Sequence, residues 1–159
     1  MLKVKTFCFI VFMSVCVRSF AAAEYAKQYD PARDPAKDLQ AALSTARTEG
    51  KLVLMEIGGD WCVWCHRLDE FLHAEQKLWQ QLNDVFVVLK VNVSEENENK
   101  TFLSQYPSVI GYPHIFILNN EGELLASQNT GELEQGKTYS TENVTNFIAK
   151  WRATLNSAR

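Results

Sequence analysis

The chain has 159 residues, and its 16 lysines and arginines stand against 19 aspartates and glutamates, for a formal net charge of −3 at pH 7. Three basic residues, Lys3, Lys5 and Arg18, fall in the first 23 positions, which hold no acid, so the remainder carries 13 basic and 19 acidic side chains and a net charge of −6. An acidic chain is a poor partner for nucleic acids or anionic membrane surfaces, and both are excluded from the expected partners.

The N-terminus has the layout of a secretory signal peptide. Lys3 and Lys5 form a positive region, residues 7–17 form an apolar stretch, and a run of three alanines ends at Ala23. The apolar stretch is shorter than the roughly 20 residues that a membrane-spanning helix needs. We predict cleavage after Ala23, export to the periplasm or out of the cell, and no stable membrane association afterwards. Arg18 inside the segment keeps an uncleaved anchor as the alternative.

Cleavage would remove two of the four cysteines, Cys8 and Cys16, and would leave only Cys62 and Cys65. Small exported proteins normally use cysteines as structural disulfides. A single adjacent pair therefore indicates chemistry. The 136 residues after Ala23 suit one domain with a core of its own, and we expect a monomer that needs no cofactor or metal.

Residues 24–34 are polar and predict a flexible lead-in to a domain that occupies residues 35–159. Asp34 followed by Pro35 starts a helix well, because aspartate caps free N–H groups and proline suits the first helical position. Gly50 suits the end of that helix. The short apolar run at residues 52–57 then favours a buried strand.

The remaining elements follow from apolar periodicity, β-branched runs and turn residues. In chain order they are a helix from about Cys62, a further helical turn or two at 75–82, a strand at 85–93, a polar helix at 96–105, a strand at 114–118, its hairpin partner at 123–127, a loop at 129–139 and a helix over 140–155. Helices between strands make parallel crossovers, and the late hairpin adds an antiparallel edge. We therefore predict an α/β fold, a three-layer sandwich with a mixed central sheet.

The segment Trp61-Cys62-Val63-Trp64-Cys65 lies where the first strand gives way to a helix. Two cysteines three positions apart can form and break a disulfide with little backbone motion. The first thiol would lie at the helix N-terminus, where unpaired N–H groups and the helix dipole stabilise a thiolate. Because the thiolate is the form that attacks disulfides, the motif predicts thiol-disulfide exchange.

Other interpretations of the motif stay open. The pair could be an inert disulfide, or part of a module that binds clients without turnover. Cys62-x-x-Cys65-His66 also matches a c-type haem attachment motif, although Met55 in the predicted strand is a poor second ligand. A zinc site of both cysteines with His66 and His73 would need four ligands from one helix, which cannot easily converge.

In its order of elements the chain resembles the thioredoxin superfamily over nearly all of the part after the signal. The strand at 52–57 leads into Trp-Cys-x-x-Cys, and Glu56 stands six residues before the first cysteine, where the family often has a buried aspartate. Pro113 precedes the strand at 114–118, where the family has its cis-proline. The chain looks most like exported single-domain members, and is similar to the C-terminal thioredoxin domain of periplasmic interchange reductases, which share Asp-Trp-Cys-Val-x-Cys with residues 60–65.

The resemblance implies catalytic roles for three residues. Cys62 would be the nucleophile, and Cys65, one helical turn on and more buried, would resolve the mixed disulfide. Glu56 would be a buried carboxyl that relays a proton to or from Cys65. Exported thiol-disulfide oxidoreductase activity follows, with reduction favoured, and Val63-Trp64 in place of Gly-Pro leaves the direction of electron flow to be measured.

The resemblance also implies how clients bind. A cis bond between Tyr112 and Pro113 would present backbone beside the disulfide for pairing with a client chain. Trp61 and Trp64 could form an apolar platform for partners; of the two, we expect Trp61 to pack in the core and Trp64 to be exposed. The expected partners are protein thiols and disulfides together with an upstream redox protein.

Overall fold

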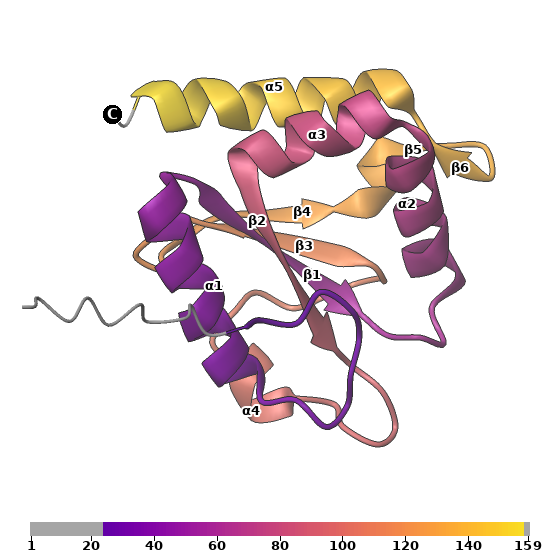
Figure 1. Ribbon diagram of the computed structural model, residues 1–159. Helices are drawn as coiled ribbons and strands as arrows, with labels where there is room; N and C mark the ends of the chain where they lie inside the picture. Colours follow the sequence, from indigo (N-terminus) through magenta and orange to yellow (C-terminus); the bar gives the residue numbers. More distant parts are fainter. Residues whose placement is uncertain (1–23, 158–159) are drawn as a thin grey trace, which may run out of the picture.

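The computed structural model describes residues 24–157, so the predicted signal peptide, residues 1–23, lies outside the described residues. A four-stranded sheet in the order β2-β1-β3-β4 forms the centre of the protein (Figure 1). The strands are β1 (Leu52–Gly58), β2 (Phe86–Asn92), β3 (His114–Leu118) and β4 (Leu124–Asn129). β1 is parallel to β2 and antiparallel to β3, and β3 is antiparallel to β4, so the sheet is mixed as predicted.

Helices cover both faces of the sheet (Figure 1). One face carries α1 (Pro35–Glu49) and α4 (Lys100–Leu103), and the other carries α2 (Val63–Ala74), α3 (Gln76–Val85) and α5 (Thr141–Ser157). Between β4 and α5, where a loop was expected, the chain forms the 3₁₀ turn η1 (Thr130–Leu133) and a small sheet of β5 (Glu134–Gln135) and β6 (Thr138–Tyr139). The predicted three-layer α/β sandwich is confirmed. Within residues 24–157, no helix is both long enough and apolar enough to cross a bilayer.

β1 is an inner strand, and every residue in it is buried. Its side chains alternate between two cores. Val53, Met55 and Ile57 pack with α1, whereas Leu52 and Leu54 pack with α2, α3 and α5. The continuous apolar run in the sequence therefore reflects a strand that is covered on both faces.

The helix before β1, α1, begins and ends at the residues that the sequence predicts. The Asp34 side chain accepts hydrogen bonds from the N–H groups of Ala36 and Lys37, which caps the helix as predicted. Gly50 follows the last turn with φ of 64°, a left-handed conformation that glycine adopts without strain.

The helix predicted at residues 96–105 is wrong in extent, since only α4 forms there. Asn99 takes the left-handed conformation with φ of 49°, and its side-chain amide donates to the Asn92 carbonyl at 2.7 Å. The Asn97 side chain donates to the Pro31 carbonyl at 2.9 Å. Asparagine side chains that bond to backbone groups compete with helix formation, and here they order a loop instead.

Residues 24–34 are packed against the domain, which corrects the expectation of a flexible lead-in. The Ala26 carbonyl accepts the Lys90 N–H of β2 at 3.0 Å. Ala26 and Tyr29 are both buried, with 4% and 7% of their surfaces exposed. Tyr29 therefore enters the interior from a segment whose sequence resembles a loop.

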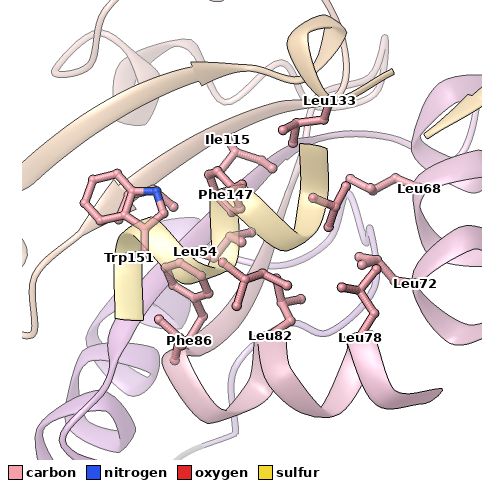
Figure 2. Close-up of a cluster of buried hydrophobic side chains, with 14 of the residues drawn as sticks. Leu54, Leu68, Leu72, Leu78, Leu82, Phe86, Ile115, Leu133, Phe147 and Trp151 are labelled. Carbon is pink, nitrogen blue, oxygen red and sulfur yellow. The ribbon is translucent and has the colours of Figure 1, made fainter. Parts of the chain in front are cut away.

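The larger of the two cores lies between the sheet and the layer of α2, α3 and α5 (Figure 2). Phe86 at the start of β2 lies in this core with 1% of its surface exposed. Its ring stacks on Phe147 of α5, with ring centroids 5.9 Å apart. This contact fixes α5 against the sheet edge.

Phe86→Ala should therefore lower the free energy of unfolding by about 3–5 kcal/mol, because it leaves a cavity in a packed core. Leu125→Ala is the matched control: Leu125 is 42% exposed, and its loss should change the same quantity by no more than about 0.5 kcal/mol. Urea unfolding followed by tryptophan fluorescence measures both. Equal effects of the two substitutions would contradict this description of the core.

Candidate active site

A disulfide joins Cys62 and Cys65 at the start of α2, just after β1 ends, and their Cα atoms are 5.2 Å apart. The last residue of β1, Gly58, lies directly beneath this bond. A Cβ at Gly58 would lie only 2.5 Å from the Cys65 sulfur, so no larger residue fits there without a shift. The strand end and the cysteine pair are thus packed as one unit.

Cys62 is the N-cap of α2. Its sulfur accepts a hydrogen bond from the backbone N–H of Cys65 at 3.1 Å. Unpaired N–H groups and the dipole at a helix N-terminus favour negative charge, so a thiolate at this position would be stabilised. Cys65 lies inside the first turn and is completely buried, while Cys62 keeps 3% of its surface exposed. The arrangement makes Cys62 the cysteine suited to attack.

The two tryptophans of the motif have the reverse of their expected environments. Trp61 is 56% exposed, and its indole N–H donates to the Val93 carbonyl at 2.6 Å. Trp64 is half-buried because its ring packs edge-on against Tyr139 of β6, with centroids 5.8 Å apart. Trp64 was expected to be exposed because residues 129–139, which contain Tyr139, were predicted to form a loop.

The Tyr112–Pro113 peptide bond is cis. Pro113 is buried, and its carbonyl accepts a hydrogen bond from the Thr130 hydroxyl at 2.6 Å. Tyr112 packs against the cysteine pair and meets the Trp61 ring edge-on, with centroids 5.3 Å apart. The structure therefore brings Trp61 and Tyr112 together beside the disulfide, with the cis-proline Pro113 directly after Tyr112.

Two exposed apolar residues near these segments were not predicted from the sequence. Val63, the first residue of α2, is 60% exposed, and Ile110, two residues before Tyr112, is 80% exposed. The sequence could not predict that they are exposed, because apolar residues in a motif or a loop can equally be buried. Together with Trp61 they make the segments beside the disulfide apolar.

Glu56 lies on β1 two residues before Gly58, so the two point to the same face of the sheet. Only 2% of Glu56 is exposed, and its carboxylate accepts a hydrogen bond from the Tyr29 hydroxyl at 2.5 Å. Burial raises the pKa of Glu56, and the nearby Lys90 ammonium opposes part of that rise. Glu56 is thus a buried carboxyl that is easier to protonate than one in water.

Three polar residues around Glu56 were missed from the sequence. Lys90 on β2 is paired with Glu56 in the strand register, and its ammonium forms an ion pair with Asp69 of α2. The same ammonium lies 4.8 Å from the centre of the Tyr29 ring. Lys90 could have been noticed in the sequence, because a lysine inside the apolar run at 85–93 suggests a buried charge with a partner. Nothing in the sequence around Tyr29 indicates its contact with Glu56, which is 27 residues away.

His66 is exposed, and its ring nitrogen contacts the Asp60 carbonyl at 2.7 Å. The ring therefore lies against the loop before α2. His114 is buried on β3 with Ser127 as partner at 2.7 Å, and burial lowers its pKa. Among the described residues, no three histidines, cysteines or acids gather into a possible metal site.

Several curated proteins are similar to this chain. It matches a family model described as thioredoxin-like over residues 34–120. The thiol:disulfide interchange protein DsbD of Actinobacillus pleuropneumoniae is 32% identical over 98 residues, which cover 61% of this chain and 16% of that protein. The protein of the same name from Pseudomonas fluorescens is 29% identical over 119 residues, or 74% of this chain and 18% of that one. The chain therefore spans less than a fifth of the length of these relatives.

Solved structures agree with these matches. A disulphide isomerase from Xylella fastidiosa Temecula1 superposes with a TM-score of 0.66 and 27% identity, covering 77% of this chain and 94% of that one. The oxidised C-terminal domain of Neisseria meningitidis DsbD has a TM-score of 0.54 and 19% identity over 82% of this chain and 98% of that one, which shows a likeness of fold. With a disulfide-bonded cysteine pair between β1 and α2 and a family model that covers more than half of its length, the chain belongs to the thioredoxin-like family.

Proposed function

We propose that the protein is an exported thiol-disulfide oxidoreductase that reduces disulfides in client proteins through Cys62 and Cys65. The observation that carries the proposal is the position of the Cys62 sulfur at the N-cap of α2, where it accepts the Cys65 N–H. This position stabilises a thiolate on the more accessible of the two cysteines. An inert cross-link would need no such position.

The reaction starts from the dithiol form. The Cys62 thiolate attacks one sulfur of the client disulfide, and the other client sulfur leaves as a thiolate. Cys65 then loses its proton and attacks the Cys62 sulfur, which forms the internal disulfide and releases the second client thiol. Two electrons have passed from the cysteine pair to the client, and an upstream dithiol protein must return them.

Reduction is favoured by the relatives whose name is thiol:disulfide interchange protein. The segment Asp60-Trp61-Cys62-Val63-x-Cys65 resembles the motif of the reductases in that group. The disulphide isomerase among the solved structures makes isomerisation the nearest alternative direction. The reduction potential of the pair distinguishes the two.

Client binding is assigned to the residues around the disulfide. The exposed face of Trp61 and the half-buried Tyr112 flank the cysteine pair, and the cis bond to Pro113 holds Tyr112 in its backbone conformation there. Trp64 contributes a smaller surface because it packs against Tyr139. Exposed apolar and aromatic groups of this kind suit an unfolded client segment.

The site of action is proposed to be the periplasm or the cell exterior. The support comes from the sequence, where a basic start, a short apolar stretch and alanines up to Ala23 form a secretory signal. The acidic remainder gives no support to binding nucleic acid.

Reduced protein should cleave the disulfides of insulin, which is detected as turbidity from the released chains. When the pair is equilibrated against glutathione, its potential should lie near that of thioredoxin, about −270 mV. A Cys62→Ala variant should have no activity and serves as the control. A potential higher by about 100 mV would identify an oxidant or isomerase and would refute the reductase direction.

Cys65→Ala should accumulate mixed disulfides with client proteins in the compartment where the protein acts, because the attacking thiolate remains and the resolving thiol is lost. Cys62→Ala should accumulate none. Non-reducing electrophoresis after acid quenching and alkylation of free thiols measures both. Equal trapping by the two variants would contradict the assigned roles.

Glu56→Gln should remove a pH dependence of stability. Because burial raises the folded-state pKa of Glu56 above 4.5, the native state holds this proton more tightly than the unfolded state. Its contribution to stability is therefore present below about pH 4.5 and is lost as pH rises through the folded-state pKa. The free energy of unfolding of the wild type should fall relative to Glu56→Gln over this interval, as urea unfolding at a series of pH values would measure. A difference that does not vary with pH would contradict a raised pKa.

A further inference from the structure

The hydroxyl of Tyr29 bonds to the buried carboxyl of Glu56 and lies near the disulfide. It donates a hydrogen bond to Glu56 at 2.5 Å. A Cβ placed on Gly58 would lie 2.6 Å from this hydroxyl oxygen and 2.5 Å from the Cys65 sulfur, so both atoms lie close to one point beside Gly58. Tyr29, Cys62 and Cys65 form a buried cluster of their own. Among the described side chains, Tyr29 is the hydrogen-bond donor to Glu56.

We propose that Tyr29 carries the proton between Cys65 and Glu56 during resolution of the mixed disulfide. This inference rests on the proposed function and deepens it, since it names the group through which the resolving thiol loses its proton. Sequence resemblance assigned the proton exchange directly to Glu56 and Cys65. The structure places a third group beside both of them, and this group comes from the N-terminal segment 24–34.

The step balances as a relay of two protons. The Tyr29 hydroxyl passes its proton to the Glu56 carboxylate and takes the proton of the Cys65 thiol, so the tyrosine is neutral before and after. Cys65 becomes a thiolate, forms a bond to the Cys62 sulfur, and breaks the bond between that sulfur and the client sulfur, which leaves as a thiolate. Burial raises the pKa of Tyr29 well above its ordinary value, which keeps the hydroxyl protonated at both ends of the step.

A cavity of about 380 Å³ gives the proton a route away from Glu56. Its wall includes the buried Glu56 and Lys90 at one part and the exposed Lys27 and His73 at another. The charged or titratable groups that face the Glu56–Tyr29 pair are Lys90 of β2, Asp69 of α2 and Tyr139 of β6. Most of the other residues in the wall are apolar, so we expect water molecules to be held beside these polar groups, in a chain between the buried acid and solvent.

Single turnover with dithiobis(nitrobenzoate) separates the two chemical steps without a client protein. Attack by Cys62 on the reagent releases one coloured nitrobenzoate thiolate, and resolution by Cys65 releases the second. Tyr29→Phe keeps the ring and removes the hydroxyl. Near neutral pH it should leave the first phase unchanged and slow the second by about 10²-fold, the lower end of the range for general acid–base help.

The pH profile distinguishes a proton carrier from a structural role. Without the hydroxyl, Cys65 must lose its proton to solvent, so the deficit in Tyr29→Phe should shrink as pH approaches about 8.5, the ordinary pKa of a thiol. A deficit of constant size across pH would refute the proposal. Tyr106→Phe is the matched control: this half-buried tyrosine stacks on Phe116 in the other core, and its loss of a hydroxyl should change neither phase.

Combining Tyr29→Phe with Glu56→Gln tests whether the two groups act in series. Each single variant should slow resolution by a similar factor, and the double variant should be no slower than either. Fully additive losses would refute a relay. In the unchanged protein, rates in mixtures of light and heavy water should curve as expected for two moving protons, and a single-proton dependence would refute it independently of any variant.

The failure of this inference differs from the failure of the proposed function. A first phase in the wild type no faster than that of free cysteine would overturn the proposed function. A normal first phase with an unchanged second phase in Tyr29→Phe would overturn only the role of Tyr29.

Discussion

A carboxyl group buried in the central strand constrains the polar interior of this protein. Glu56 is 2% exposed on β1, and a charged or polar group in such a place costs free energy unless it has partners. Tyr29 supplies the hydrogen bond, while Lys90 supplies a positive charge that is itself paired with Asp69. These partners come from the N-terminal segment, β2 and α2. One acid on β1 therefore requires a polar or charged side chain from each of three other parts of the chain.

The two cysteines lie in different electrostatic environments. Cys62 has the backbone N–H groups of α2, which favour its negative form without any ionisable neighbour. Cys65, one turn later and fully buried, has no such stabilisation and lies above Gly58 next to the Tyr29 hydroxyl. A thiol in apolar surroundings holds its proton more tightly than one in water. This difference between the environments matches the proposed roles, in which Cys62 attacks and Cys65 passes its proton to an acceptor before it resolves the mixed disulfide.

Most of the architecture could be predicted because its signals are local. The apolar run of β1, the Asp34-Pro35 helix start and the cysteine spacing each depend on neighbours in the sequence. The predictions that failed depend on distant contacts. Trp64 is covered by Tyr139, which is 75 residues away from it, and Tyr29 bonds to Glu56 across 27 residues. The asparagines at 97 and 99 also override the helical pattern around them by bonding to distant or neighbouring backbone.

The N-terminal segment also covers part of the exposed edge of the sheet, at β2. β2 is an edge strand, and the free N–H and C=O groups of such a strand invite pairing with another molecule. The outward N–H of Lys90 is instead taken by the Ala26 carbonyl at 3.0 Å, three residues before Tyr29. The segment thereby blocks strand addition at this point of the edge. A chain cut after Tyr29 would lose both the hydroxyl that bonds to Glu56 and the cover on the β2 edge, so a defect in the proposed proton relay and a tendency to aggregate would arise from the same cut.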